Sequence, residues 1–427
     1  MEEKIKKYLK GDTVIWFVFI VLCFVSVLSV YSTAGALAFH GYGTVISIVL
    51  RHAKYLALGA LVVYILHVIP YQWLRVLNYV LLGLTFVALL FALITSERSF
   101  FAIFQPSEFA KVSVIVFIAD MLARKQQKTA PDEAFNVIAI VSLALCALIA
   151  PLKLSSALLI AAVTVFLLII GRVSFKKIAT YCGLLLLVGI PYLLVGFNFP
   201  EETLKSNKVT NVISRAPTHS KRVGQIFSKN NEYYHYIDQK TKQPDSIKIK
   251  YRMKTHDEEA SIFGIKFTLK DLDRRQAVNA LIAISKAPPV IGLPGTGEQK
   301  YYLANSYDDY IFSIIVEETG VIAGILIIVL YLILLFRAGV ITRKSNQAFP
   351  TLVVVGITLL IVLQALVHIS VSADSFITGE TLPLISRGGS AIIATCGCFG
   401  LILSISRHLN DSEVQSSNSS NVQEFEH

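Results

Sequence analysis

Two adjacent acids, Asp308 and Asp309, stand where a long polar segment meets an apolar run, in the stretch NSYDDYIF. Charge beside hydrocarbon is costly, so such residues usually have a partner or a function. Aspartate also caps helix N-termini well, which is the simpler interpretation of Asp308. An ionised carboxylate near water can act as a general base. The pair therefore indicates either a helix cap or acid–base chemistry at the edge of a membrane.

Two more acids, Glu317 and Glu318, follow in the same run, YDDYIFSIIVEETG. In a helix that begins at Asp309 they would lie about 12 Å further along, at 1.5 Å per residue. We expect at least one of them to find a partner or to take up a proton. A buried hydrogen-bonding role in the structure is the simpler interpretation of both.

A second cluster is FQPSEFAK, residues 104–111. Pro106 suits the first turn of a helix, and Ser107 and Glu108 suit its N-terminus, where the helix dipole favours negative charge. Glu108 and Lys111 are three residues apart and can pair along one helix face. Spacing alone favours a self-neutralising pair that makes a membrane helix tolerable. A pair that faces an interior cavity is the functional alternative.

A third cluster is TGETLPLISRGGS, residues 378–390. Gly388 and Gly389 allow a backbone to approach another helix or a ligand closely. Arg387 either extends towards lipid headgroups or contacts a phosphate.

Further basic residues, Arg215, Lys221 and Arg222, lie in the stretch SRAPTHSKRVGQIF. Basic side chains beside a membrane can hold a pyrophosphate, and Arg suits bidentate phosphate contacts. A solvated charged face, or attraction to anionic lipid, is the simpler interpretation. The sequence contains no Walker loop, HExxH, zinc-type Cys/His spacing or GxSxG motif.

Membrane helices must position these clusters. The 427 residues are 54% hydrophobic and 16% charged, with a mean hydropathy of +0.61, and a soluble chain of this length would need more charge. The net charge of +10 does not indicate nucleic acid, because much of the excess lies in short loops between apolar runs. We predict an all-α integral membrane protein with about ten transmembrane helices, at residues 14–34, 52–69, 74–95, 106–123, 134–151, 155–171, 177–198, 309–336, 350–373 and 384–406.

Lys and Arg are concentrated in alternate loops, which predicts that both termini face the cytoplasm. The largest connection, of roughly 110 residues, is too long for a simple loop. In it, residues 246–252 alternate like a strand, and RRQAVNALIAI is apolar enough for a re-entrant or interfacial helix. The predicted parts are a cytoplasmic N-terminus (1–13), helices 1–7 (14–198), an extracytoplasmic loop between helices 7 and 8 (199–308), helices 8–10 (309–408) and a disordered cytoplasmic tail (409–427).

The three clusters together resemble the SEDS family, the FtsW/RodA/SpoVE group of bacterial cell-wall synthases, over nearly the whole chain. FQPSEFAK matches the most recognisable motif of the family, YDDYIFSIIVEETG looks like its TDF…EE stretch, and TLPLISRGGS is similar to its LP-S-x-GGS signature. KGDTVIW, RHAKYLALG and RAPTHSKRVGQIF look most like the FtsW branch of Bacteroidetes-type bacteria.

The resemblance implies a multi-pass protein of the bacterial cytoplasmic (inner) membrane that polymerises lipid II on its outer face, in cell division or cell shape. An acceptor GlcNAc hydroxyl would attack the anomeric carbon of a lipid-linked MurNAc donor, and undecaprenyl pyrophosphate would leave. The essential loop-end Asp of the family aligns with Asp309, which would deprotonate or orient the acceptor. Asp308 would be a helix cap or an electrostatic neighbour. Cationic side chains or a divalent cation, Mg²⁺ or Mn²⁺, would stabilise the departing pyrophosphate.

The implied partners are lipid II, undecaprenyl pyrophosphate, a class B penicillin-binding protein and other divisome proteins, with no nucleic acid. The catalytic candidate is Asp309. The substrate-binding candidates are Glu108, Lys111, Arg215, Lys221, Arg222, Arg387 and Ser390. The candidates that shape the cavity are Gln105, Pro106, Ser107, Asp308, Glu317, Glu318, Gly388 and Gly389.

The chain also departs from the family pattern. Leu152 stands where the family carries an acid, and Lys153 follows it, so that a cavity carboxylate is lost and a cation gained. Arg387 replaces the usual Tyr or Met. These changes leave two other interpretations open, a flippase for lipid-linked precursors and a non-catalytic division scaffold.

Overall fold

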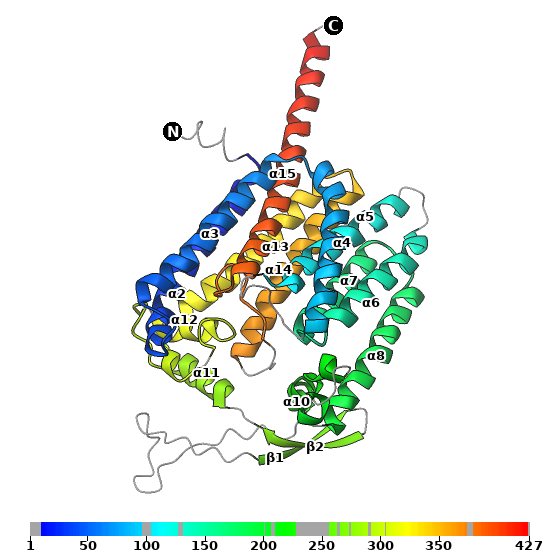
Figure 1. The fold of residues 1–427 in the computed structure, drawn as a ribbon. Coiled ribbons are helices and arrows are strands. Elements are labelled where there is room, and N and C mark those ends of the chain that lie inside the picture. Colours follow the sequence, from blue (N-terminus) through cyan, green and yellow to red (C-terminus); the bar gives the residue numbers. More distant parts are fainter. Residues whose placement is uncertain are drawn as a thin grey trace.

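The computed structural model describes residues 10–95, 104–126, 131–199, 201–205, 210–227, 256–262, 265–272, 275–288, 292–303, 305–373 and 379–425. Long helices pack side by side in one bundle (Figure 1). Nine of the ten predicted spans each coincide with one helix, and the span 309–336 coincides with two. The helices are α2 (Thr13–Phe39), α3 (Val45–Val68), α4 (Tyr71–Thr95), α5 (Pro106–Gln126), α6 (Phe135–Ile149), α7 (Leu154–Ile170), α8 (Phe175–Asn198), α12 (Ile311–Thr319), α13 (Val321–Arg343), α14 (Ala348–Ser372) and α15 (Gly389–Phe425).

Eight of the described helices are long and apolar enough to cross a membrane, so the prediction of a multi-pass membrane protein is confirmed. The count of ten spans stays a prediction. Helix α7 is apolar but has only 17 residues. Helix α5 carries several charges, and it packs against α4, α6, α7, α14 and α15. Because α5 is surrounded by other helices, its charged side chains can face protein instead of lipid.

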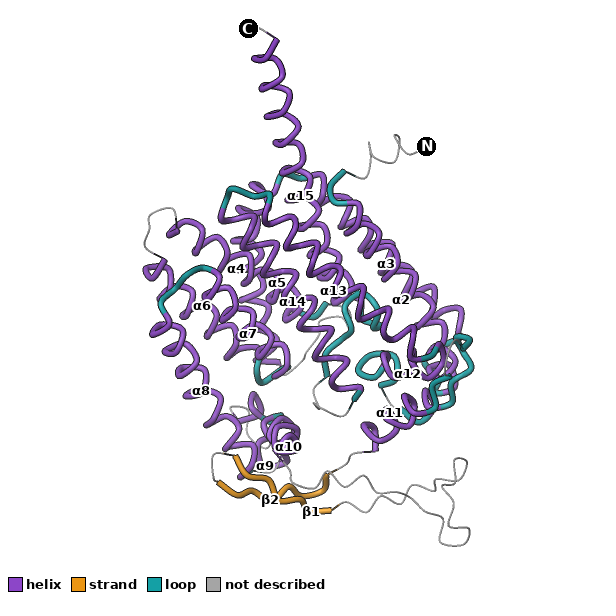
Figure 2. The backbone as a smooth tube through the Cα atoms, turned by 180° about the vertical axis from the view of Figure 1, so that it is seen from behind, coloured by secondary structure: helices purple, strands orange, loops and turns teal. Residues whose placement is uncertain are grey.

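The segment between α8 and α12 forms a small layer at one end of the bundle. It contains α9 (Glu201–Lys205), a 3-10 turn (Thr210–Ile213), α10 (Ala216–Phe227), an antiparallel pair of strands, β1 (His256–Ile262) and β2 (Ile265–Leu272), then α11 (Arg275–Ser285) and a second 3-10 turn (Gln299–Tyr301). The start of α2 and the end of α15 lie at the opposite end (Figures 1 and 2). The predicted interfacial helix is α11, whereas the predicted strand at 246–252 lies outside the described residues.

One prediction about the helices was wrong. The span predicted at 309–336 is not one helix, because Gly320 has φ 94° and ψ 164° and divides it into α12 and α13. Glycine adopts this conformation at no steric cost because it has no Cβ. Helix α15 continues to Phe425, into the segment 409–427 for which a disordered tail is predicted. A helix already nucleated in the bundle extends readily through residues that include neither Gly nor Pro.

The segment 379–388, between α14 and α15, is largely buried in the bundle. Neighbouring helices satisfy its carbonyl groups: Tyr331 donates to the Pro383 oxygen at 2.7 Å, and Ser26 donates to the Leu384 oxygen at 2.6 Å. Non-helical backbone at membrane depth is tolerated only where protein satisfies its polar groups in this way. These contacts hold the segment in place beside α5 and α14.

Candidate active site

Four buried charged residues, Glu108, Lys111, Lys153 and Glu380, form what we term the ion network. The Lys111 Nζ lies 2.8 Å from Glu108 Oε2 and 3.4 Å from Glu380 Oε2. The Lys153 Nζ lies 3.2 Å from Glu108 Oε1 and 3.2 Å from Glu380 Oε2. The predicted pairing of Glu108 with Lys111 is confirmed. Because each carboxylate contacts both ammonium groups, the network joins α5, the α6–α7 turn and the 379–388 segment.

Neutral side chains complete the hydrogen bonding of the network. Lys111 donates to the Gln364 Oε1 at 3.0 Å, and Ser156 donates to the Glu380 Oε1 at 2.6 Å. Burial alone would lower the pKa of Lys153, but the carboxylates of Glu380 and Glu108 outweigh it and raise this pKa above its usual value. Buried charges persist when they are paired and hydrogen-bonded in this manner.

The candidate residues chosen from the sequence did not include two members of the network. Glu380 belongs to the third cluster but was not singled out, although an acid in an apolar stretch requires a partner. Lys153 was noted only as a departure from the family pattern. The structure shows that its charge is neutralised by Glu108 and Glu380, which come from distant parts of the chain.

Asp309 lies directly beside the ion network. Its carboxylate is half-buried and accepts a hydrogen bond from Asn305 Nδ2 at 3.3 Å. It packs on Gly379, where a Cβ atom would lie only 2.9 Å from Asp309 Oδ1. The Gly379 oxygen accepts a hydrogen bond from Ser155 at 3.1 Å, and the next residue is Glu380. The fold therefore brings Asp309 against Gly379, the residue that precedes Glu380 of the ion network.

The interpretation of Asp308 as a helix cap is wrong. Helix α12 begins at Ile311, its N-cap residue is Tyr310, and no side chain caps it. A turn over residues 305–310 separates Asp308 from the first helical residue, so its carboxylate stands too early to reach the free amides. Ser386 donates to the Asp308 carbonyl oxygen at 2.9 Å.

Glu317 and Glu318 have the structural role that was the simpler interpretation. Glu317 accepts from the amide of Glu298 at 3.0 Å, and Glu318 accepts from the amide of Gly295 at 2.8 Å and from Lys300 Nζ at 2.9 Å. The two carboxylates lie at the end of α12 and not deep in a continuous span. They attach the segment before α12 to the bundle.

The glycines of the third cluster differ from one another. A Cβ at Gly389 would lie 2.9 Å from the Tyr55 ring, so this glycine does allow a close approach. At Gly388 the nearest atom would be 3.5 Å away, an ordinary contact.

The Arg387 guanidinium lies over the Tyr307 ring, 5.3 Å from its centroid, and is half-buried. A cation in this position is attracted by the face of the ring.

The first and third clusters also meet outside the ion network. The Gln105 amide donates to Ser390 Oγ at 2.8 Å, just before Pro106 begins α5 as predicted. Ser107 is buried, and its hydroxyl has no hydrogen-bond partner among the described residues. These residues shape the N-terminal end of α5, and none of their described contacts indicates a ligand-binding role.

Of the three basic candidates in the polar segment, only Arg215 has a described side chain, and it lies at the site. Arg215 Nη1 donates to the Leu152 carbonyl oxygen at 3.3 Å, next to Lys153 of the ion network. Leu152 is itself buried. Lys221 and Arg222 lie on α10, but their side chains fall outside the described residues, so their contacts stay a prediction.

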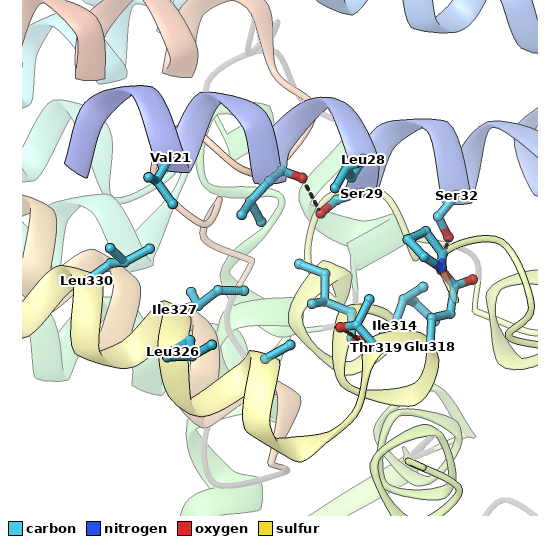
Figure 3. A pocket seen from close by; sticks show the side chains of 14 residues that line it. Val21, Leu28, Ser29, Ser32, Ile314, Glu318, Thr319, Leu326, Ile327 and Leu330 are labelled. Atoms are coloured by element: carbon cyan, nitrogen blue, oxygen red, sulfur yellow. Dashed lines mark hydrogen bonds between the residues drawn. The ribbon is translucent and has the colours of Figure 1, made fainter. Parts of the chain in front are cut away.

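A separate apolar groove of about 240 Å³ lies between α2, α12 and α13. Figure 3 shows Val21 of α2 across from Leu330 of α13, and at the other end Ser32 donates a hydrogen bond to Glu318. The groove shares no residue with Asp309 or with the ion network.

The side chains do not fit a cation held by protein ligands alone. Among the residues that the structure describes, there is no group of three His, Cys, Asp or Glu that could hold a metal ion. A divalent cation would therefore depend on phosphate oxygens of a substrate.

Comparisons with known proteins find relatives over most of the chain. A family described as "Cell cycle protein", which covers FtsW, RodA and SpoVE, matches residues 12–225 and 273–411. A protein of Bacillus subtilis named "Probable peptidoglycan glycosyltransferase FtsW" is 28% identical over 432 aligned positions, which cover 96% of this chain and 94% of the relative. A protein of Hahella chejuensis with the same name is 38% identical over 135 residues, but the match spans 30% of this chain and only 34% of the relative.

Solved structures show the same fold. The crystal structure of the rod shape determining protein RodA of Thermus thermophilus has a TM-score of 0.58 at 18% identity, and the match covers 94% of this chain and 98% of that chain. A chain from a structure titled "Structural coordination of polymerization and crosslinking by a peptidoglycan synthase complex" has a TM-score of 0.59 at 19% identity, and the match covers 94% and 99%.

Proposed function

Because the chain belongs to the FtsW/RodA/SpoVE family of cell cycle proteins, we propose that it is a peptidoglycan glycosyltransferase that polymerises lipid II in cell division, with Asp309 as general base. One observation carries the assignment of the base: the Asp309 carboxylate is half-buried and packs on Gly379, directly beside the ion network. A carboxylate held at the edge of a buried polar cluster can accept a proton from a bound hydroxyl.

The reaction is an exchange of one carbon–oxygen bond for another. Asp309 takes the proton from a hydroxyl group of the acceptor GlcNAc, and the oxygen attacks the anomeric carbon of the lipid-linked MurNAc donor. The bond from that carbon to the pyrophosphate breaks, and undecaprenyl pyrophosphate leaves with the electron pair. Arg215 and Arg387 supply positive charge for the pyrophosphate, since both guanidinium groups lie next to segments of the site.

The ion network has a different task from the two arginines. Its lysines are already neutralised by Glu108 and Glu380, so it positions the 379–388 segment and does not offer free charge. A divalent cation would bind through the pyrophosphate, and no step of this mechanism passes through it.

We extend the proposal to orientation and partners. Both termini are assigned to the cytoplasm and the site to the outer face of the bacterial inner membrane. The start of α2 and the end of α15 lie at the same end of the bundle, opposite the layer that holds α10 and α11, which supports this orientation (Figure 1). A class B penicillin-binding protein is the proposed partner among the divisome proteins, supported by the similarity to a chain of a peptidoglycan synthase complex.

The test uses the purified full chain, with its partner, in vesicles that contain labelled lipid II. We expect Asp309→Ala to lower polymer formation by about 100-fold or more, the usual contribution of a general base. Glu133→Gln is the matched control, because Glu133 is an exposed acid paired with Lys125 at the other end of α5. Full polymerisation by Asp309→Ala would contradict the assignment of the base.

The same vesicles separate the alternatives. Translocation of the headgroup without polymer would support a flippase. Neither activity, with binding of the partner intact, would support a scaffold.

A further inference from the structure

Asp308 is a half-buried residue to which the mechanism so far assigns no role. Its Oδ1 atom is fully buried and has no hydrogen-bond partner within the described part of the chain. Its backbone is held on both sides, because the amide donates to the Asn305 oxygen at 3.2 Å and the carbonyl oxygen accepts from Ser386 at 2.9 Å.

The charged groups that face Asp308 come from every neighbouring element. They are Lys153 from the α6–α7 turn, Glu108 from α5, Glu380 from the 379–388 segment and the adjacent Asp309. The Tyr307 hydroxyl also interacts with Asp308, and the Arg387 guanidinium lies over the Tyr307 ring. The Lys153 ammonium is already shared by Glu108 and Glu380. Among the described residues, no cation forms an ion pair with Asp308, so an ionised Asp308 would add an uncompensated charge to a neutral cluster. Such a charge is strongly disfavoured.

Asp309 is placed differently. It accepts a hydrogen bond from Asn305 Nδ2 at 3.3 Å, which favours its ionised form. The described residues give Asp309 a donor but none to the buried Asp308 Oδ1. Two adjacent carboxyls in this arrangement will not both carry a charge readily, and the proton belongs to Asp308.

We propose that Asp308 and Asp309 share one proton at neutral pH, with Asp308 as the protonated member, so that Asp308 is a positioning residue that keeps the single negative charge on the base. This inference rests on the proposed function of Asp309. During turnover Asp309 accepts the proton of the acceptor hydroxyl and returns it to water, and the proton on Asp308 stays in place.

The pair has a consequence at alkaline pH. Burial and the charge of Asp309 raise the pKa of Asp308 to about 8, against the opposing effect of Lys153. Above this pH Asp308 ionises, and a second negative charge then faces the incoming pyrophosphate. Polymerisation is therefore expected to fall on the alkaline side. At pH 9 only about a tenth of the protein would keep the proton on Asp308, so the rate should drop about tenfold from its plateau.

The experiment is the pH profile of lipid II polymerisation, from pH 6 to 10, for the full chain with its partner in vesicles. Asp308→Asn mimics the protonated carboxyl at every pH. We expect it to stay within about threefold of the unchanged protein at pH 7 and to lack the alkaline decline, so that the ratio of the two rates rises about tenfold by pH 9. A purely structural role would change the rates at all pH values alike.

Two further variants keep the test decisive if the amide disturbs folding. Asp308→Thr is also neutral and should lack the decline, whereas Asp308→Glu should retain it. An alkaline decline that persists unchanged in Asp308→Asn or Asp308→Thr would overturn the inference, as would a folded Asp308→Asn that is inactive at every pH. Asp309→Ala at pH 7 tests the proposed function separately, because its activity does not depend on where the decline lies.

Discussion

Removal of the Lys111 ammonium is expected to destabilise the protein strongly. Lys111 is 1% exposed and contacts Glu108 at 2.8 Å, Gln364 at 3.0 Å and Glu380 at 3.4 Å. Lys111→Met keeps much of the apolar volume but leaves two buried carboxylates facing the single ammonium of Lys153. The network changes from neutral to a net charge of one negative unit. Loss of one partner from a buried ion pair costs about 3–5 kcal/mol.

The chain offers a matched control for this variant. Lys125 Nζ lies 2.7 Å from Glu133 Oε2, a similar distance, but the two side chains are 36% and 62% exposed. An exposed ion pair contributes about 0–1 kcal/mol, because water screens it. Lys125→Met should therefore change the stability little.

The assay is thermal unfolding of the purified protein in detergent, followed by intrinsic fluorescence. We expect Lys111→Met to unfold well below both the unchanged protein and Lys125→Met. The double variant Lys111→Met with Glu108→Gln restores neutrality, and we expect it to recover part of the loss, by a coupling of about 0.5–3 kcal/mol. The reasoning is refuted if Lys111→Met unfolds like Lys125→Met, or if the double variant is less stable than the single one.

Two other substitutions test the contacts around the site. Gly379→Ala would place a Cβ 2.9 Å from Asp309 Oδ1, so we expect the rate of polymerisation to fall at least about tenfold with folding retained. Gly388→Ala is the control and should be active, because its nearest contact is at 3.5 Å. Equal rates for the two variants would contradict this expectation. Glu318→Gln leaves the buried Lys300 without its ion pair, which should lower the stability by about 3–5 kcal/mol. The segment before α12 should then become more sensitive to protease. An unchanged digestion pattern would argue against an anchoring role of Glu318.

Much of the helical architecture was predictable because its signals are local. A run of apolar residues must be long enough to cross hydrocarbon, and nine of the ten predicted spans each coincide with one helix. Pro106 begins α5 as expected, because its missing amide hydrogen costs nothing in a first turn. The break at Gly320 was missed because a single glycine in an apolar run is compatible with a continuous helix.

The candidate site was likewise predictable only where the signal is local. The pair of Glu108 and Lys111 follows from their spacing on one helix, since residues three apart lie on the same face. The cap assigned to Asp308 failed, because the first residue of α12 depends on how the preceding turn packs against Ser386 and not on the nearest acid.

The sequence by itself determined a membrane-embedded helical protein with acids at the mouth of an apolar run and one charge pair on a helix face. Only the tertiary structure decided which charges neutralise which. Lys111 and Glu380 are 269 residues apart in the chain, yet their side chains meet in the centre of the bundle. Burial requires that each charge have a partner, but it does not say which one. Helix packing makes that choice: in the described part of the chain it pairs Lys153 with Glu108 and Glu380 instead of Asp308, and it gives Asp309 a donor.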